Sequence, residues 1–242
     1  GNLFNRCFAR EGRHNFVTGS RVTGPHVWLD SLSVQNNSDE GPHHRWATGL
    51  LFDNAASQIF NVQNRADSGT GHGWAGAQTL LWNIWATGTV VSDAPLAAMN
   101  WVVGGFGTQA ESSFTPAEPD GWWESWQTDV VPRSLYLAQL EDRLGAAAVA
   151  NVTIPAQLNG DIWALLNGWA GEGALANATP LDPVVCTGVL STNGEVCCAA
   201  SCGMCGGTGC GGFPGGADNC CTSAIISAGL SCATNPPPCL MP

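Results

Sequence analysis

Short apolar stretches alternate with turn-forming residues along roughly the first hundred positions. Runs of β-branched and aromatic residues, each about five residues long, are separated by Gly, Asn, Asp and Pro. An amphipathic helix would instead repeat its apolar positions every three or four residues. The first part of the chain is therefore predicted to consist of short strands joined by turns.

The strand pattern recurs along the chain. Two sets of positions repeat at spacings of 27 to 30 residues: Val34, Val62 and Val90, and the aromatic residues Phe16, Trp46, Trp74 and Trp101. We predict a short right-handed parallel β-helix of about four coils, in which equivalent side chains stack about 4.8 Å apart. The four aromatic residues would then form one inward-facing ladder. A propeller is the competing architecture, but its blades run to about 40 residues or more.

The pattern changes after the repeat. Residues 134–145 place Leu137, Leu140 and Leu144 on one face of an amphipathic helix, and residues 161–169 predict a shorter one. The chain is thus mainly β with a flanking helix and a disulfide-rich end. The predicted domains are β-helix coils over residues 1–107, a helical and irregular segment packing on or capping them over 108–183, and a disulfide-rich module over 184–242.

Charged residues are scarce, and every basic one is arginine. They make up 11% of the chain, against about 25% in typical domains, and the net charge is −11. A nucleic-acid partner would require a basic stripe, which this sequence lacks. The absence of lysine excludes Schiff-base chemistry. No apolar run approaches about 18 residues, so no membrane span is predicted.

Ten of the eleven cysteines lie near the end of the chain: Cys186, Cys197, Cys198, Cys202, Cys205, Cys210, Cys220, Cys221, Cys232 and Cys239. This segment has few large apolar side chains, so we predict five disulfides, whose pairing stays open. A zinc site is the alternative, but the segment has no histidine and twice the thiols that a site needs. Cys7 is predicted to be a buried small residue rather than an intermolecular crosslink.

Sequons and cysteines together indicate a secreted, extracellular protein. Three N-x-S/T sequons begin at Asn36, Asn151 and Asn177, which are the predicted glycosylation sites. The cysteine spacing of residues 186–239 resembles modules at the ends of secreted proteins of algae and other stramenopiles, and this resemblance assigns no activity. The chain begins with Gly1 rather than Met, which we interpret as a processed or truncated product.

Several motifs resemble secreted pectate-lyase-like β-helix proteins. They are Arg-His-Asn-Phe at 13–16, Gly-Pro-His-His-Arg-Trp-Ala-Thr-Gly at 41–49 and Gly-His-Gly-Trp-Ala-Gly at 71–76. Residues 134–140 resemble the helix that closes those proteins. The resemblance covers roughly residues 10 to 150 and implies a polysaccharide context. Those proteins usually have more coils, and this chain begins within a coil.

Histidines form the main candidate site. His14, His44 and His72 each stand two residues before an aromatic residue of the predicted ladder, so a β-helix would align them in a column. Arginine binds carboxylates through paired hydrogen bonds, and histidine can act as a base. Of the possible roles of these histidines we favour a structural polar ladder. Contact with an acidic sugar, or catalysis, comes second, and metal ligation comes last. No metal or cofactor is predicted. The flanking binding residues would be Arg13, Asn15, His43 and Arg45; in an enzyme the catalytic residues would be His44, Arg45 and His72.

Acidic and tryptophan-rich segments offer weaker candidates. Trp122, Trp123 and Trp126 lie beside acidic residues and could form a sugar-binding platform, although packing against the coils is the simpler explanation. Asp30 and Asp53 are a candidate carboxylate pair for glycoside hydrolysis. Residues 39–40, Asp-Glu, are predicted to form a solvated loop.

Two functions fit these patterns. The preferred one is an extracellular structural or carbohydrate-associated binding protein, a subunit of a cell-surface or matrix filament that self-associates through the ends of its β-helix. The alternative is a polysaccharide lyase, or another carbohydrate-active enzyme, acting on an acidic polysaccharide. The predicted partners are a polysaccharide or glycan and further copies of the chain, with no nucleic acid.

Overall fold

The computed structural model describes residues 1–169, 189–190 and 197–198. The chain divides into two compact units, Gly1–Leu166 and Asn167–Pro242, and the first is described here by itself. The predicted disulfide module lies almost entirely outside the described residues. Of this module the structure describes only the short antiparallel pairing of β14 (Val189–Leu190) with β15 (Cys197–Cys198).

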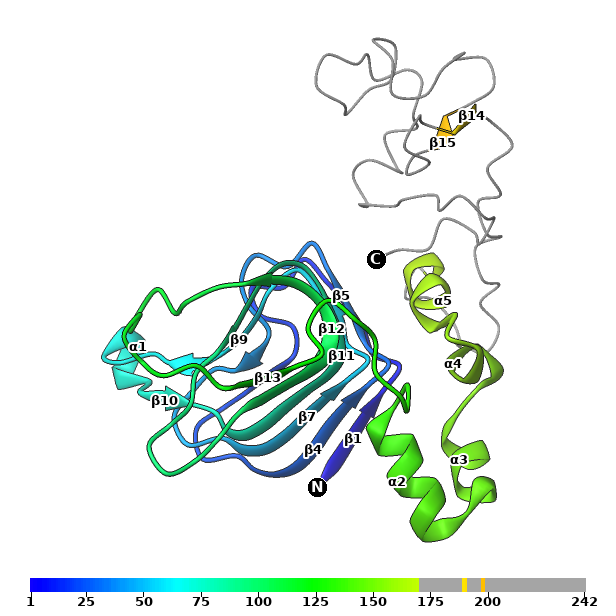
Figure 1. The fold of residues 1–242 in the computed structure, drawn as a ribbon, viewed down its shortest axis with the longest axis horizontal. Coiled ribbons are helices and arrows are strands. Elements are labelled where there is room, and N and C mark those ends of the chain that lie inside the picture. The colour runs from blue at the N-terminus through cyan, green and yellow to red at the C-terminus, as the bar shows by residue number, and fades with distance from the viewer. Residues whose placement is uncertain (170–188, 191–196, 199–242) are drawn as a thin grey trace. The chain divides into compact units, whose positions relative to one another are not determined.

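The first unit is mainly β, with a few helices at its C-terminal end (Figure 1). Its strands are β1 (Asn2–Asn5), β2 (Phe8–Arg10), β3 (Val17–Thr18), β4 (Thr23–Leu29), β5 (Leu32–Val34), β6 (Gly41–Pro42), β7 (Thr48–Asp53), β8 (Ala56–Ser57), β9 (Phe60–Asn64), β10 (Trp74–Ala75), β11 (Ala77–Ser92), β12 (Trp101–Gln109) and β13 (Trp122–Glu124). The helices are α1 (Ser68–Gly71), α2 (Leu135–Leu144), α3 (Ala146–Val152), α4 (Pro155–Asn159) and α5 (Ile162–Gly168); in the second unit β14 is Val189–Leu190 and β15 is Cys197–Cys198.

Most neighbouring strands run parallel, because the chain passes over the same surface several times. The first ladder contains β1, β4, β7, the start of β11, β12 and β13. The second contains β2, β5, β8 and the middle of β11. The third joins β3 to β6, continues through a bridge between Glu40 and Phe60 to β9, and ends on the last part of β11. The result is a curled, mostly parallel sheet, compatible with the predicted β-helix-like fold.

The chain bends at equivalent positions where the first ladder leads into the second. The residues there have left-handed backbone angles: Arg6 (φ 57), Asp30 (φ 49), Asn54 (φ 51), Asn83 (φ 45) and Gly104 (φ 68). Backbone hydrogen bonds join successive bends, as from Asp30 N to Asp53 O at 2.9 Å. Asn and Asp are the side-chain-bearing residues that adopt this conformation most readily. The aspartates and asparagines between the strands therefore form the corners of the sheet.

Aromatic rings stack on the inner side of the first ladder. The ring of Trp28 lies 4.9 Å from that of Phe4 and 4.6 Å from that of Phe52, with interplanar angles of 13° and 5°. Leu81 and Val102 occupy the next two positions of the same ladder. All but Phe4 belong to the main hydrophobic core. This stack runs through the core of the unit.

The aromatic ladder therefore differs from the predicted one. Phe4 pairs with Trp28, and Trp28 pairs with Phe52, each 24 positions on; the next step, to Leu81, is 29 positions, and the one to Val102 is 21. A fixed period near 28 residues is thus wrong, because the loops between strands differ in length.

The predicted ladder residues consequently do not form one inward-facing stack. Phe16 is buried, whereas Trp46 is 71% exposed, so the two rings do not share an interior stack. Trp101 pairs with Leu80 in the first ladder and not with Trp74. Val90 likewise pairs with Phe60, which breaks the predicted valine ladder.

Helices cover part of the outer face of the first ladder (Figure 1). The helix predicted over residues 134–145 is confirmed as α2, which is capped by Ser134 Oγ accepting a hydrogen bond from Leu137 N at 3.1 Å. Leu137 and Leu140 are buried, but Leu144 is 68% exposed, so its predicted place on the packed face is wrong. The shorter predicted helix is confirmed as α5.

Buried carboxylates fasten the helical segment to the corners of the sheet. Asp53 Oδ2 accepts hydrogen bonds from Ser134 Oγ at 2.8 Å and from Tyr136 N at 2.7 Å. Asp30 accepts two hydrogen bonds from the guanidinium of Arg133, at 2.7 and 3.1 Å. Both aspartates are fully buried. Asp30 and Asp53, the candidate glycosidase pair, therefore hold the helical segment against the sheet, and their buried carboxylates cannot be reached by a polysaccharide.

Candidate functional site

Four of the five histidines gather at one edge of the third ladder; we call them the histidine cluster. His14 precedes β3, His43 and His44 follow β6, and His72 lies in the loop between β9 and β10. The parallel pairing of β3 with β6, and the antiparallel pairing of β9 with β10, bring these loops to the same edge. The cluster thus combines three successive passes of the chain.

His43 is the centre of the cluster. Its ring lies 4.1 Å from that of His14 and 5.1 Å from those of His44 and His72. The rings of His44 and His72 stack at 4.2 Å with an interplanar angle of 24°. The three histidines predicted to form a column are therefore brought together, but His14 reaches the other two only through His43.

Asp39 orients His14. The Nδ1 atom of His14 lies 2.8 Å from the backbone oxygen of Asp39 and 3.4 Å from its Oδ1. The Nε2 atom is buried, and no described residue hydrogen-bonds to it. A proton on Nδ1, shared with the carbonyl, leaves the lone pair on Nε2. The buried Nε2 atom of His14 can thus accept a hydrogen bond, but no described residue donates one to it.

Arg65 packs against His43. Its Nη1 donates to the backbone oxygen of His43 at 3.1 Å and lies 2.9 Å from Nε2 of the ring. The pKa of His43 is lowered to about 4, first by burial and then by the positive charge of Arg65 and by His14, whereas Asp39 acts in the opposite direction. The ring of His43 is therefore neutral near pH 7.

His72 is the most enclosed member of the cluster, at 7% exposure. Its Nδ1 is buried, and no described residue hydrogen-bonds to it. Burial, followed by the neighbouring His44 and Arg65, lowers the pKa of His72. Gly69 passes directly over the ring, where a Cβ atom would lie 2.5 Å from Nε2. A side chain at this position would displace the imidazole, so the glycine leaves space for it.

Arginines and a tryptophan border the cluster; we call Arg13, Arg21, Arg45 and Trp46 the arginine edge. Arg45 donates to the backbone oxygens of Gly71 at 2.8 Å and Thr70 at 3.2 Å, which ties the loop of His72 to the previous pass. Arg13 and Arg21 are exposed, and their guanidinium groups have no partner among the described residues. The indole of Trp46 is 71% exposed.

The predicted solvated loop at residues 39–40 is wrong, because both side chains are buried. Glu40 accepts hydrogen bonds from the backbone of Asn15 at 2.9 Å and from Ser33 Oγ at 2.6 Å. Asn15, a predicted binding residue, also donates its side-chain amide to Ser33 at 2.7 Å. Asn15 therefore forms hydrogen bonds inside the fold and is not available as a binding residue. Burial raises the pKa of Glu40.

Sequence reasoning missed Arg65 and the role of Asp39 in the cluster. Arg65 stands outside the quoted motifs and reaches His43 only because the β9–β10 hairpin folds back. Asp39 lies in the loop before β6, and its contact with His14 comes from the pairing of β3 with β6, which no local motif indicates.

The predicted tryptophan platform forms a separate group at β13. Trp122 is exposed and pairs with Trp101, while the rings of Trp123 and Trp126 meet at 5.0 Å and pack against the core. Packing accounts for two of the three side chains, but they pack against the interior core and not against the outside of the coils. The fold does not bring them to the histidine cluster by any contact among the described residues.

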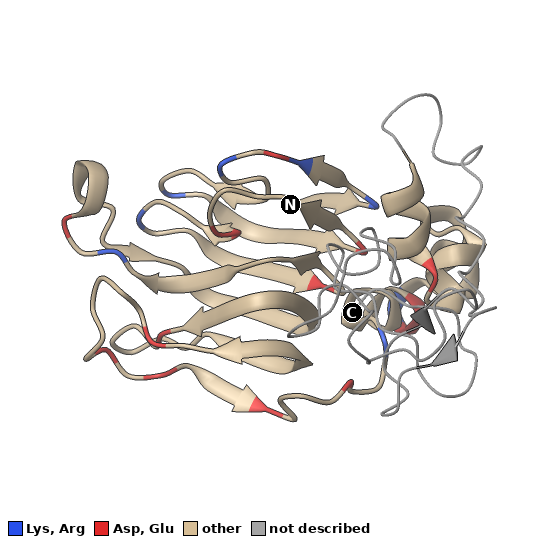
Figure 2. Ribbon diagram, turned by 90° about the horizontal axis from the view of Figure 1, so that it is seen from above, with Lys and Arg blue, Asp and Glu red and all other residues tan. Residues whose placement is uncertain are grey.

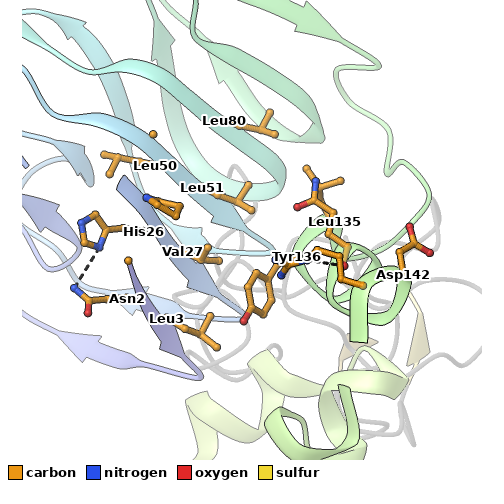
Figure 3. Close-up of a pocket in the computed structure, with 15 residues that line it drawn as sticks. Asn2, Leu3, His26, Val27, Leu50, Leu51, Leu80, Leu135, Tyr136 and Asp142 are labelled. Atoms are coloured by element: carbon orange, nitrogen blue, oxygen red, sulfur yellow. Dashed lines mark hydrogen bonds between the residues drawn. The ribbon is translucent and has the colours of Figure 1, made fainter. Parts of the chain in front are cut away.

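The remaining histidine, His26, lies in a groove between the first ladder and α2 (Figure 3). The groove has a volume of about 720 Å³ and is lined on the sheet side mainly by apolar residues such as Val27, Leu51 and Leu80. The ring of His26 is 3.3 Å from the amide nitrogen of Asn2. This single imidazole makes His26 a natural reference for experiments on the cluster.

The sequons and Cys7 occupy different environments. Asn36 is buried, and its amide nitrogen donates to the backbone oxygen of Ser38. Asn151 is exposed in the last turn of α3, whereas Asn177 lies outside the described residues. The thiol of Cys7 is half-buried against the core, and burial raises its pKa. Asn151 is therefore the better placed of the two described sequons for glycosylation, which stays a prediction.

No family model, curated protein or solved structure matches the chain. The likeness to pectate-lyase-like proteins is therefore limited to a parallel, curled sheet of a compatible kind. In the part of the chain that the structure describes, none of the helices has the length and apolar character needed to cross a bilayer.

Proposed function

We propose that this is an extracellular carbohydrate-binding protein, built on a short right-handed parallel β-helix, that holds an acidic glycan at the arginine edge. The exposed indole of Trp46 carries the proposal, because a tryptophan that is 71% exposed leaves a large flat apolar surface in water. Such a face suits the flat apolar side of a sugar ring. Arg45, next to it in sequence, is held by two backbone carbonyls, which steadies this edge.

Charge at the arginine edge suits a carboxylated sugar. Arg13 and Arg21 are exposed, and guanidinium groups bind carboxylates through two parallel hydrogen bonds. The chain as a whole is acidic, but several carboxylates of the early passes, Asp30 and Glu40 among them, are buried and engaged. Figure 2 shows the basic residues concentrated on these early passes. An acidic polysaccharide would thus meet positive charge on a negatively charged protein.

Replacing Trp46 with alanine is expected to weaken binding to acidic oligosaccharides at least tenfold, which corresponds to about 1.4 kcal/mol. Isothermal titration with oligomers of pectin, alginate and glucuronan provides the measurement. Trp122→Ala, which removes another exposed indole, is the matched control and should bind like the parent protein. Equal affinity of the Trp46 variant and the parent would contradict the proposal. Unsaturated uronates appearing in these mixtures would instead favour a lyase.

Uneven charge supports a second role, as a subunit of a cell-surface or matrix assembly. Residues 1–72 hold six of the eight arginines and six acidic residues, but four of these carboxylates are buried: Asp30, Asp39, Glu40 and Asp53. Residues 73–132 hold six acidic residues and no basic one. Figure 2 shows the two sets on different passes. At the acidic side, β13 pairs only with β12 among the described strands, which leaves one strand edge open. Complementary charge and an open edge favour head-to-tail contact between copies.

The assembly proposal predicts association that depends on salt. Light scattering should give a mass above that of one chain at low ionic strength and the mass of one chain at high ionic strength, because salt screens surface charge. Replacing Glu124 and Asp129 with Gln and Asn should reduce the mass at low salt. A single-chain mass under every condition would exclude this role and leave the glycan proposal untouched.

A further inference from the structure

We propose that His43, His44 and His72 form a binding site for a divalent transition metal ion such as Zn²⁺ or Co²⁺. Each offers one ring nitrogen, and these three atoms lie within 4.8 Å of one another. In a tetrahedral zinc site, nitrogens bound at about 2.0–2.1 Å are about 3.4 Å apart. Closing the site therefore takes side-chain rotations that bring the nitrogens closer by up to about 1.4 Å, together with a movement of Arg65 away from His43, and a fourth position stays open for water or an anion.

The buried Nδ1 atom of His72 points to a ligand. This side chain is 7% exposed, and Nδ1 has no hydrogen-bond partner among the described residues. Leaving such an atom unsatisfied costs stability, so native proteins fill these positions with a donor, a water molecule or an ion. A metal ion shared with His44 would satisfy this lone pair. The ring of His44 now stacks on that of His72 at 4.2 Å, so it must turn until the in-plane lone pairs of both rings point at the ion.

The surroundings of the site set its character. The guanidinium of Arg65 contacts both ring nitrogens of His43, Nδ1 and Nε2, so the metal ion must displace it whichever of the two it binds. Asp39, beside His14 and His43, supplies negative charge on the same side. Competition with Arg65 predicts moderate affinity, and an open position near arginines predicts that an anion completes the coordination. Imidazole nitrogens select zinc, cobalt, nickel or copper over calcium and magnesium.

Cobalt titration of the full chain, with its disulfides intact and free thiols alkylated, tests the site without any glycan. One Co²⁺ per chain is expected, with ligand-field bands in the visible spectrum and no thiolate charge-transfer band. His44→Ala and His72→Ala should each weaken Co²⁺ binding at least tenfold. His26→Ala is the matched control, because it removes an imidazole outside the cluster, and should bind Co²⁺ like the parent protein.

The variants also separate this inference from the others. His44 is only half-buried, so its variant should fold even if the His72 variant does not, which tryptophan fluorescence checks. Trp46→Ala should lose glycan affinity yet bind Co²⁺ normally, so either proposal can fail alone. Undiminished Co²⁺ binding by His44→Ala, or a thiolate band that assigns the metal to cysteines, would overturn the site.

Discussion

Replacing Trp28 with alanine is expected to lower the free energy of unfolding of the first unit, Gly1–Leu166, by about 3–5 kcal/mol. We call this unit the β unit. Trp28 is 4% exposed, and its ring is stacked on both faces, by Phe4 and by Phe52. Truncation removes the buried apolar surface and leaves a cavity that a stack held by parallel strands cannot close. The loss is large because both neighbouring rings lose their partner.

Urea unfolding followed by tryptophan fluorescence provides the measurement. Ten of the eleven tryptophans lie in the β unit, so the fluorescence signal reports mainly on its unfolding; the eleventh is Trp169. Trp122→Ala, at 55% exposure, is the control and should change stability by less than about 1 kcal/mol. Trp28→Phe should retain most of the stability, since it keeps a ring in the stack. Similar losses for the Trp28 and Trp122 alanine variants would contradict an interior stack.

The same ladder shows how far the sequence predicts this fold. The strand and turn pattern is local, so it indicated parallel passes and the helix of residues 134–145 correctly. The register between paired strands is not local, because it depends on the number of residues in each connecting loop. The hairpin that carries His72 lengthens one pass, so the spacing from Phe52 to Leu81 is 29, against 24 in the pass before. A single period fitted to the whole chain cannot capture this change.

The histidine cluster was easier to anticipate than the ladder. Loops of successive parallel passes meet at one edge of the sheet even when the register is misjudged by several residues. Trp46 and Trp74 do lie next to each other, joined from N to O at 2.9 Å, so His44 and His72 meet as expected. The predicted alignment of Phe16 with Trp46 is wrong, because β3 pairs with β6 at Val17 and Gly41, and His14 therefore contacts His43 instead of His44.

Asp53 is expected to make the β unit less stable as the pH rises from about 4 to about 7. The lowered pKa of His43, about 4, has the opposite effect over the same interval, so the contribution of Asp53 has to be measured against a variant that lacks it. The pKa of Asp53 is raised from 3.8 to about 6, mainly by burial and also by Asp30, although hydrogen bonds from Tyr136 and Ser134 oppose the shift. Burial likewise raises the pKa of Asp93 to about 6. Between these values the folded state keeps protons that the unfolded state has released. The contribution of Asp53 to stability therefore falls with rising pH, by up to about 3 kcal/mol.

Asp53→Asn tests the sign of this effect. An amide oxygen can still accept the hydrogen bonds from Ser134 and Tyr136, but the side chain no longer ionises. The urea midpoint of the parent relative to that of the variant should fall as the pH rises from about 4 to about 7, whereas the exposed Asp161→Asn should follow the parent. If the midpoint of the parent relative to the variant instead rises over this interval, Asp53 is held as a carboxylate, and its hydrogen bonds to Ser134 and Tyr136 outweigh the cost of its burial.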